Sequence, residues 1–195
     1  MKTMNVRHRR SKAAPRNKQR GFGIMDMLIG VAIFAVVIGA IFAIMTVVQN
    51  SNKAINQGRA ATQLITEIQK LYDQNYTTLT TTLINTGKLA PKPFTAPTGT
   101  TLQHAWGGAV VVGPGNQAGA TPITQFKLTF TGIPQDTCLD FVKQLSGASY
   151  SLWVGGTTAG THDVVPAGTG TFDQSKAITQ CAALAATGNI ILVTQ

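Results

Sequence analysis

An uncharged run of 22 residues, 27–48 (MLIGVAIFAVVIGAIFAIMTVV), constrains the fold of this chain more than any other feature. As an α-helix it would span about 33 Å at ~1.5 Å per residue, enough for the ~30 Å hydrocarbon core of a bilayer. The run is longer than the apolar region of an ordinary secretory signal, and no small-residue cleavage site follows it. A core helix of a soluble protein is the alternative, but such helices rarely lack a polar face over this length. The run therefore predicts a membrane-spanning helix.

The net charge of +9 is concentrated before this run. Residues 1–21 hold eight of the 16 Lys and Arg residues and no acid, whereas the remaining chain has eight against seven acids, a balance of +1. Because basic flanks stay on the cytoplasmic side, we expect residues 1–21 in the cytoplasm and the C-terminal part across the membrane. A nucleic-acid-binding arm is the alternative, but orientation explains the charges, and direct contact with nucleic acid is not expected.

Asp26 stands at the edge of the apolar run. A carboxylate held within lipid costs roughly 2.5–3.5 kcal/mol even on the lenient insertion scale, so its presence there is a functional hypothesis. The alternative is that Asp26 lies in the headgroup layer and complements the positive end of the helix dipole.

The residues before Asp26 form a pattern: a basic leader ending at Arg20, then Gly21, the aromatic Phe22 and an acid at the fifth place after the glycine. This pattern resembles the class III signal of type IV pilins. The resemblance implies that a prepilin peptidase cuts between Gly21 and Phe22 and that the new amine of Phe22 is methylated. It also implies that Asp26, where the family usually has Glu, pairs with the N-terminus of a neighbouring subunit, since either charge alone in an apolar core would cost several kcal/mol.

After the apolar run, the pattern predicts that the helix continues as an amphipathic helix to about residue 74, because no proline occurs before Pro91. The apolar positions recur at three- and four-residue spacings: Ile55, Ala61, Leu64, Ile65, Ile68, Leu71 and Tyr72. Within the membrane half, Ala35, Gly39 and Ala43 form a ridge of small residues that favours close helix packing, although ordinary alanine use explains it equally well.

From residue 77 onward the composition shifts to Thr, Gly and Pro, which predicts a globular head. Strands are expected at residues 109–112, 125–131, 150–154 and 190–193, and helices at 135–145 and 175–186. Asp173 or Ser175 is expected to cap the second helix and Gly188 to end it. The fold class is therefore α+β, with an antiparallel sheet packed on the amphipathic half of the long helix.

Cys138 and Cys181 are the only cysteines, and both are expected outside the cytoplasm, where disulfides persist. A disulfide between them would contribute roughly 4 kcal/mol in the chain-entropy model. Two free buried thiols are the alternative. A metal site is not expected, because neither His104 nor His162 has ligand-like spacing to a cysteine.

Three stretches of the head, together with Cys181 before a terminal strand, resemble the type IVb pilins, a group that includes the toxin-coregulated and thin-pilus pilins. They are residues 85–89 (NTGKL), 104–112 (HAWGGAVVV) and 132–142 (GIPQDTCLDFV). Without the resemblance, Trp106 followed by two glycines indicates a buried aromatic residue beside a turn.

No catalytic constellation stands out, so neither an enzyme activity nor a cofactor is expected. His162 and Asp163 are adjacent, but no nucleophile can be placed beside them, and they read as a solvated turn. The segment 113–115 (GPG) lacks the Lys-Ser/Thr of a phosphate loop. Asn75-Tyr-Thr77 matches a glycosylation acceptor pattern that is common by chance.

The sequence thus predicts four regions: a cleaved leader (1–21), a membrane and assembly half of the helix (22–48), an amphipathic half (49–76) and a head (77–195). We expect a structural subunit, the major pilin, that self-assembles into an extracellular pilus. The precursor is expected in the inner membrane, where its partners are the prepilin peptidase and the assembly machinery. A minor pilin or secretion pseudopilin is the alternative, followed by a bitopic binding protein that does not polymerise.

Overall fold

The computed structural model describes residues 23–94, 101–115, 123–156 and 162–195. The chain forms two compact units, Met1–Ala43 and Ile44–Gln195. The predicted cut between Gly21 and Phe22 lies outside the described residues.

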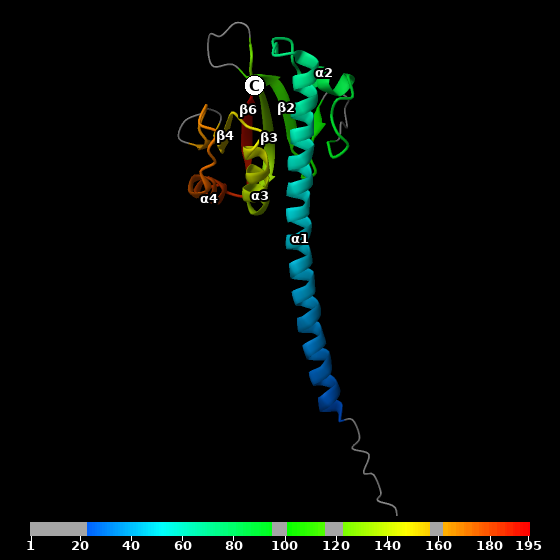
Figure 1. The fold of residues 1–195 in the computed structure, drawn as a ribbon. Helices are drawn as coiled ribbons and strands as arrows, with labels where there is room; N and C mark the ends of the chain where they lie inside the picture. The colour runs from blue at the N-terminus through cyan, green and yellow to red at the C-terminus, as the bar shows by residue number, and fades with distance from the viewer. Residues whose placement is uncertain (1–22, 95–100, 116–122, 157–161) are drawn as a thin grey trace, which may run out of the picture. The chain divides into compact units, whose positions relative to one another are not determined.

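Helix α1 (Ile24–Tyr72) begins in the first unit and ends in the second, in agreement with the predicted long helix (Figure 1). It ends at Tyr72 because the next two residues, Asp73 and Gln74, take left-handed φ angles of 40° and 65°. Left-handed residues are incompatible with a continuing right-handed helix. The predicted end near residue 74 is therefore two residues too late.

The buried face of α1 in the second unit differs from the predicted one. Leu71 is 61% exposed and Ile55 is half-buried, whereas Gln57 is buried. The buried positions are Ala54, Gln57, Ala60, Ala61, Leu64, Ile65 and Ile68. Their spacing of three and four residues is that of one helix face, but its first half consists of small residues apart from Gln57. This allows close approach: a Cβ at Gly58 would lie 2.5 Å from Cβ of Gln144 on α3.

A six-stranded antiparallel sheet forms the head, with the order β1-β2-β3-β6-β4-β5. The strands are β1 (Leu102–Gln103), β2 (Ala109–Pro114), β3 (Phe126–Pro134), β4 (Ser151–Val154), β5 (Asp163–Val165) and β6 (Thr187–Thr194). The four predicted strands correspond to β2, β3, β4 and β6, whereas β1 and β5 are too short to give a periodic signal. The register of β3 on β6 shifts between Phe130 and Ile133, where Gly132 has a φ of +74°. A glycine with a positive φ is the feature of one class of β-bulge.

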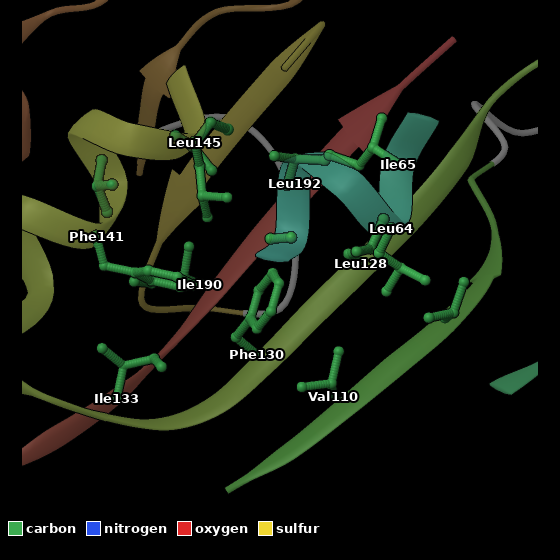
Figure 2. Close-up of a cluster of buried hydrophobic side chains, with 14 of the residues drawn as sticks. Leu64, Ile65, Val110, Leu128, Phe130, Ile133, Phe141, Leu145, Ile190 and Leu192 are labelled. Carbon is green, nitrogen blue, oxygen red and sulfur yellow. The ribbon is translucent and has the colours of Figure 1, made fainter. Parts of the chain in front are cut away.

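One face of the sheet forms the core of the head with α1 and α3 (Figure 2). Strand β3 alternates, with Phe126, Leu128 and Phe130 fully buried and Lys127 exposed. The residues that fill the centre of this core are Leu64, Ile65, Val110, Leu128, Phe130, Ile133, Phe141, Leu145, Ile190 and Leu192. The fold is thus α+β, and the predicted fold class is confirmed.

Three helices follow α1. Helix α2 (Thr81–Thr86), which was not predicted, is capped by Thr80, whose hydroxyl accepts from the backbone N–H of Leu83. Helix α3 (Gln135–Ser146) matches its prediction to one residue. Helix α4 (Gln174–Ala182) is capped by Asp173, as expected.

The predicted end of α4 is wrong. The helix stops at Ala182, four residues early, and Gly188 lies in strand β6 and does not cap the helix. Gly188 is needed in the strand, because a Cβ there would come within 2.2 Å of the Leu184 side chain. The pairing of β6 with β3 overrides the local helical pattern of residues 183–186.

Candidate functional site

The first candidate site is the apolar surface of α1. Among the described side chains of residues 23–49, all are exposed except the half-buried Ile38. Phe34 is 67% and Val36 74% exposed. An 18-residue window of this helix has a mean hydropathy of 2.9, so the helix is long and apolar enough to cross a membrane by length and composition. A continuous apolar surface of this kind needs a cover of lipid or protein.

The small residues of this segment are not explained by packing within the chain. A Cβ placed at Gly30 or Gly39 would meet no atom within 4 Å. Ala35 and Ala43, one helical turn to either side of Gly39, are exposed as well. Small residues at such spacing allow another helix to approach closely.

Asp26 lies in the first turn of α1, close to the expected new N-terminus. Its side chain is outside the described part of the structure. The methylation of Phe22 and the pairing of Asp26 with a neighbouring subunit therefore stay predictions.

The second half of α1 is fixed to the head by two carboxylates of α3. Asp136 accepts a hydrogen bond from Nδ2 of Asn50 at 2.9 Å, and Asp140 accepts one from the hydroxyl of Ser51 at 2.9 Å. Hydrogen bonds to ionised acceptors are stronger than neutral ones, although exposure weakens them here. No local sequence pattern predicts these contacts, because they join positions 86 and 89 residues apart.

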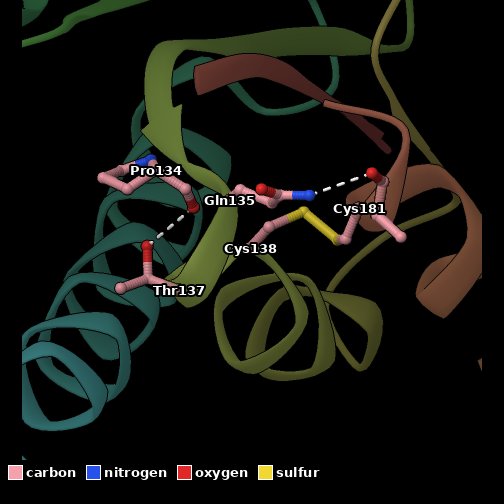
Figure 3. Close-up of a disulfide and its surroundings, with 6 residues drawn as sticks. Pro134, Gln135, Thr137, Cys138 and Cys181 are labelled. Carbon is pink, nitrogen blue, oxygen red and sulfur yellow. Dashed lines mark hydrogen bonds between the residues drawn. A yellow bond between two sulfur atoms is a disulfide. The ribbon is translucent and has the colours of Figure 1, made fainter. Parts of the chain in front are cut away.

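The cysteine pair forms the second candidate site. Cys138 of α3 and Cys181 of α4 are joined by a disulfide, with their Cα atoms 5.7 Å apart, which confirms the predicted bond (Figure 3). Both residues are buried. Next to the bond, Nε2 of Gln135 donates to the carbonyl oxygen of Ala182 at 2.9 Å. The bond therefore closes a region of 43 residues that includes β4 and β5.

His104 is the most enclosed histidine among the described residues, at 3% exposure. One ring nitrogen, Nε2, lies 2.8 Å from the carbonyl oxygen of Thr131, so it carries the proton and donates. The other, Nδ1, accepts the backbone N–H of Trp106 at 3.3 Å. Burial lowers the pKa of His104, and the hydrogen bond to Thr131 opposes this in part. His104 is thus a neutral structural residue.

Trp106 and the glycines after it complete this turn. Trp106 lies beside a turn, as expected, but it is half-buried and not buried; its ring lies edge-on to Phe141, with the ring centroids 5.6 Å apart. Gly107 has a φ of +82°. Gly108 has to be glycine, because a Cβ there would lie 1.7 Å from the carbonyl oxygen of Thr131.

His162 lies in a turn, as predicted, but it is half-buried and its Nδ1 hydrogen-bonds to Oε1 of Gln180 at 2.7 Å. Asp163 begins strand β5. Within the described ranges, no three His, Cys, Asp or Glu side chains are grouped so that they could hold a metal ion.

The chain was compared with known proteins. The family model described as PilS N terminal matches residues 48–195. No curated protein gives a significant sequence match. One similar solved structure is the type IV b pilin from Salmonella typhi, with 21% identity, 75% of this chain and 96% of that chain covered, and a TM-score of 0.47. Another is TcpA, a type IV pilin from the El Tor biotype of Vibrio cholerae, with 14% identity, 75% and 99% coverage, and a TM-score of 0.47.

The family match includes the second half of α1 and the whole head, and it leaves the leader and most of the apolar segment outside. It confirms the predicted resemblance to type IV pilins. Because the match covers more than half of the sequence, the chain belongs to the PilS family of type IV pilins.

Proposed function

We propose that this chain is the major structural subunit of an extracellular type IV pilus of the type IVb group. The chain is inserted into the inner membrane as a prepilin, loses its leader and then polymerises with other copies of itself. Its function is structural, because the family is one of filament subunits.

The observation that carries this proposal is the uncovered apolar surface of α1. Residues 27–48 carry no charge, and their described side chains are exposed almost throughout. Lipid covers this surface in the precursor. In a filament, the same surface is covered by equivalent helices of other copies, and Gly30 and Gly39 leave room for their close approach.

Removal of the leader switches the chain between these two states. A cut between Gly21 and Phe22 removes all eight leader charges, which hold the N-terminus on the cytoplasmic side. The remaining ammonium of Phe22 needs an anion once it enters an apolar filament core, and Asp26 of a neighbouring copy supplies it. The prepilin peptidase and the inner-membrane assembly machinery are the partners in these steps.

Mass spectrometry of surface-sheared fibres tests this proposal. We expect this chain to be the dominant protein of the preparation and to begin at an N-methylated Phe22. A Gly21→Leu variant is the matched control, since a bulky residue before the cut should leave the precursor uncleaved in the membrane. A mature protein that begins at Met1 would contradict the proposal, whereas a trimmed chain present only in traces would identify a minor pilin or pseudopilin.

A further inference from the structure

The turn after α1 carries a sequence motif that filament assembly does not use. Asn75-Tyr76-Thr77 is an acceptor tripeptide for N-linked glycosylation, and no other asparagine of the sequence is followed two positions later by Ser or Thr. A glycan is bulky and polar, so the asparagine that carries it has to lie at the surface of the folded protein.

The end of α1 presents Asn75 to solvent. The left-handed residues Asp73 and Gln74 turn the chain out of the helix, and the backbone N–H of Asn75 donates to the carbonyl oxygen of Tyr72 at 2.8 Å. Asn75 itself is exposed, as are Thr77 and Thr78. The acceptor therefore lies on a tight surface turn with polar neighbours.

Within this turn, the amide oxygen and the amide nitrogen of Asn75 have different surroundings. Oδ1 accepts hydrogen bonds from the hydroxyl of Thr77 at 2.8 Å and from its backbone N–H at 3.3 Å. Nδ2 makes no hydrogen bond to any residue that the structure describes. The oxygen thus holds the turn together, whereas a glycan on the nitrogen would displace no hydrogen bond to the described residues.

We propose that Asn75 is an N-glycosylation site that is modified by transfer from a glycosyl diphosphate donor. In this step a bond forms between Nδ2 and the anomeric carbon of the sugar, the bond from that carbon to the diphosphate oxygen breaks, and Nδ2 loses one proton. The diphosphate leaves with the electron pair, so neither an oxidant nor a reductant is required. A lipid-linked oligosaccharide would be the donor on the exported side of the membrane, and this case depends on the proposed export. A nucleotide-linked sugar would be the donor in the cytoplasm.

Tyr76 determines when the transfer takes place. Its ring is buried and lies 4.6 Å, centroid to centroid, from that of Phe126, and its backbone N–H donates to the carbonyl oxygen of Ile123 at 3.0 Å. A transferase has to hold the acceptor tripeptide in its own groove, which the packed Tyr76 prevents. We therefore place the transfer before the head folds. The finished glycan is compatible with the folded head, because Asn75 stays exposed there.

Intact-mass and glycopeptide analysis of the full chain, isolated from membranes and from sheared fibres of its own host, tests the proposal. We expect a mass increase on the peptide that contains Asn75, of one hexose for a nucleotide-linked donor or of an oligosaccharide for a lipid-linked donor. Asn75→Gln and Thr77→Ala should both lose the increase completely. Thr77→Ser keeps the hydroxyl and should retain it, as should the neighbouring control Thr78→Ala.

Two outcomes would overturn the proposal: a native chain with the bare polypeptide mass, or an increase that persists in Asn75→Gln. Either outcome leaves the proposed function untouched when the same fibres contain the trimmed chain. Conversely, a glycosylated chain that remains at the membrane and forms no fibres would contradict the proposed function and support the modification.

Discussion

At the scale of single residues, the stability of the head depends on the His104 imidazole being neutral. Its two ring nitrogens are both in use, one as a donor to Thr131 and one as an acceptor from Trp106. A second proton would turn the acceptor into a donor that faces another N–H. The aromatic rings of Trp106 and Phe130, which lie beside it, offer no anion to compensate.

This arrangement makes the stability of the head depend on pH. Because the pKa of His104 is lowered in the folded state, the unfolded state binds a proton at higher pH than the folded state does. The contribution of neutral His104 to the free energy of unfolding is therefore complete above the ordinary pKa of about 6.5 and is lost as the pH falls below it. Urea unfolding of the detergent-solubilised chain at pH 7.5, 6.5 and 5.5 should show a falling midpoint.

His104→Gln should flatten this dependence, since an amide does not titrate in this range. His162→Gln serves as the matched control and should keep the slope of the native chain. An equal slope in the native chain and in His104→Gln would show that other groups cause it.

At the scale of elements, the disulfide joins two helices of unequal burial. Helix α4 has only Ala177 and Cys181 buried, whereas α3 has five buried residues. The bond therefore ties α4, which has few buried side chains, to a helix with a larger buried face.

Loss of this bond should lower the free energy of unfolding by about 4 kcal/mol, because an open chain gains the conformational entropy that the 43-residue loop had lost. Urea unfolding and limited proteolysis of the double variant Cys138→Ser/Cys181→Ser and of the native chain measure this loss of stability. A reductant should destabilise the native chain and leave the double variant unchanged. Equal protease resistance of all samples would contradict a stabilising role.

Some helices and strands could be predicted from local sequence patterns and others could not. The strand expected at residues 125–131 and the helix expected at residues 135–145 are present as β3 and α3, because the patterns that predict them are local. The end of α4 was predicted wrongly, since Gly188 resembles a helix cap in sequence but pairs with Ile133 of β3 in space. The contacts of Asn50 and Ser51 with α3 join distant positions and leave no pattern.

At the scale of the whole molecule, some features of the candidate site could be predicted from the sequence and others could not. The apolar segment, the disulfide and the fold class could be predicted, because composition, the number of cysteines and hydrophobic periodicity indicate them. The roles of Gly21, Phe22 and Asp26 depend on a family resemblance and on atoms of another copy. No property of a single chain could supply those atoms.

Filament formation should depend on the carboxylate of Asp26. Asp26→Ala should still be inserted and cleaved, because neither step uses this side chain, but it should yield few fibres since the N-terminal ammonium of the neighbouring copy is left unpaired. Electron microscopy of the cell surface counts the fibres. Asp26→Glu, which keeps the charge, is the control and should form fibres; abundant normal fibres from Asp26→Ala would refute the pairing.

The sheet order also has a consequence for timing. Strand β6 (Thr187–Thr194) lies between β3 and β4, so the strand with the highest residue numbers occupies a central place. Until residues 187–194 have emerged beside the others, β3 lacks a partner on one side and β4 and β5 have nothing to join. If the head is exported through a narrow channel, as proposed, its sheet cannot be completed until residues 187–194 have also passed.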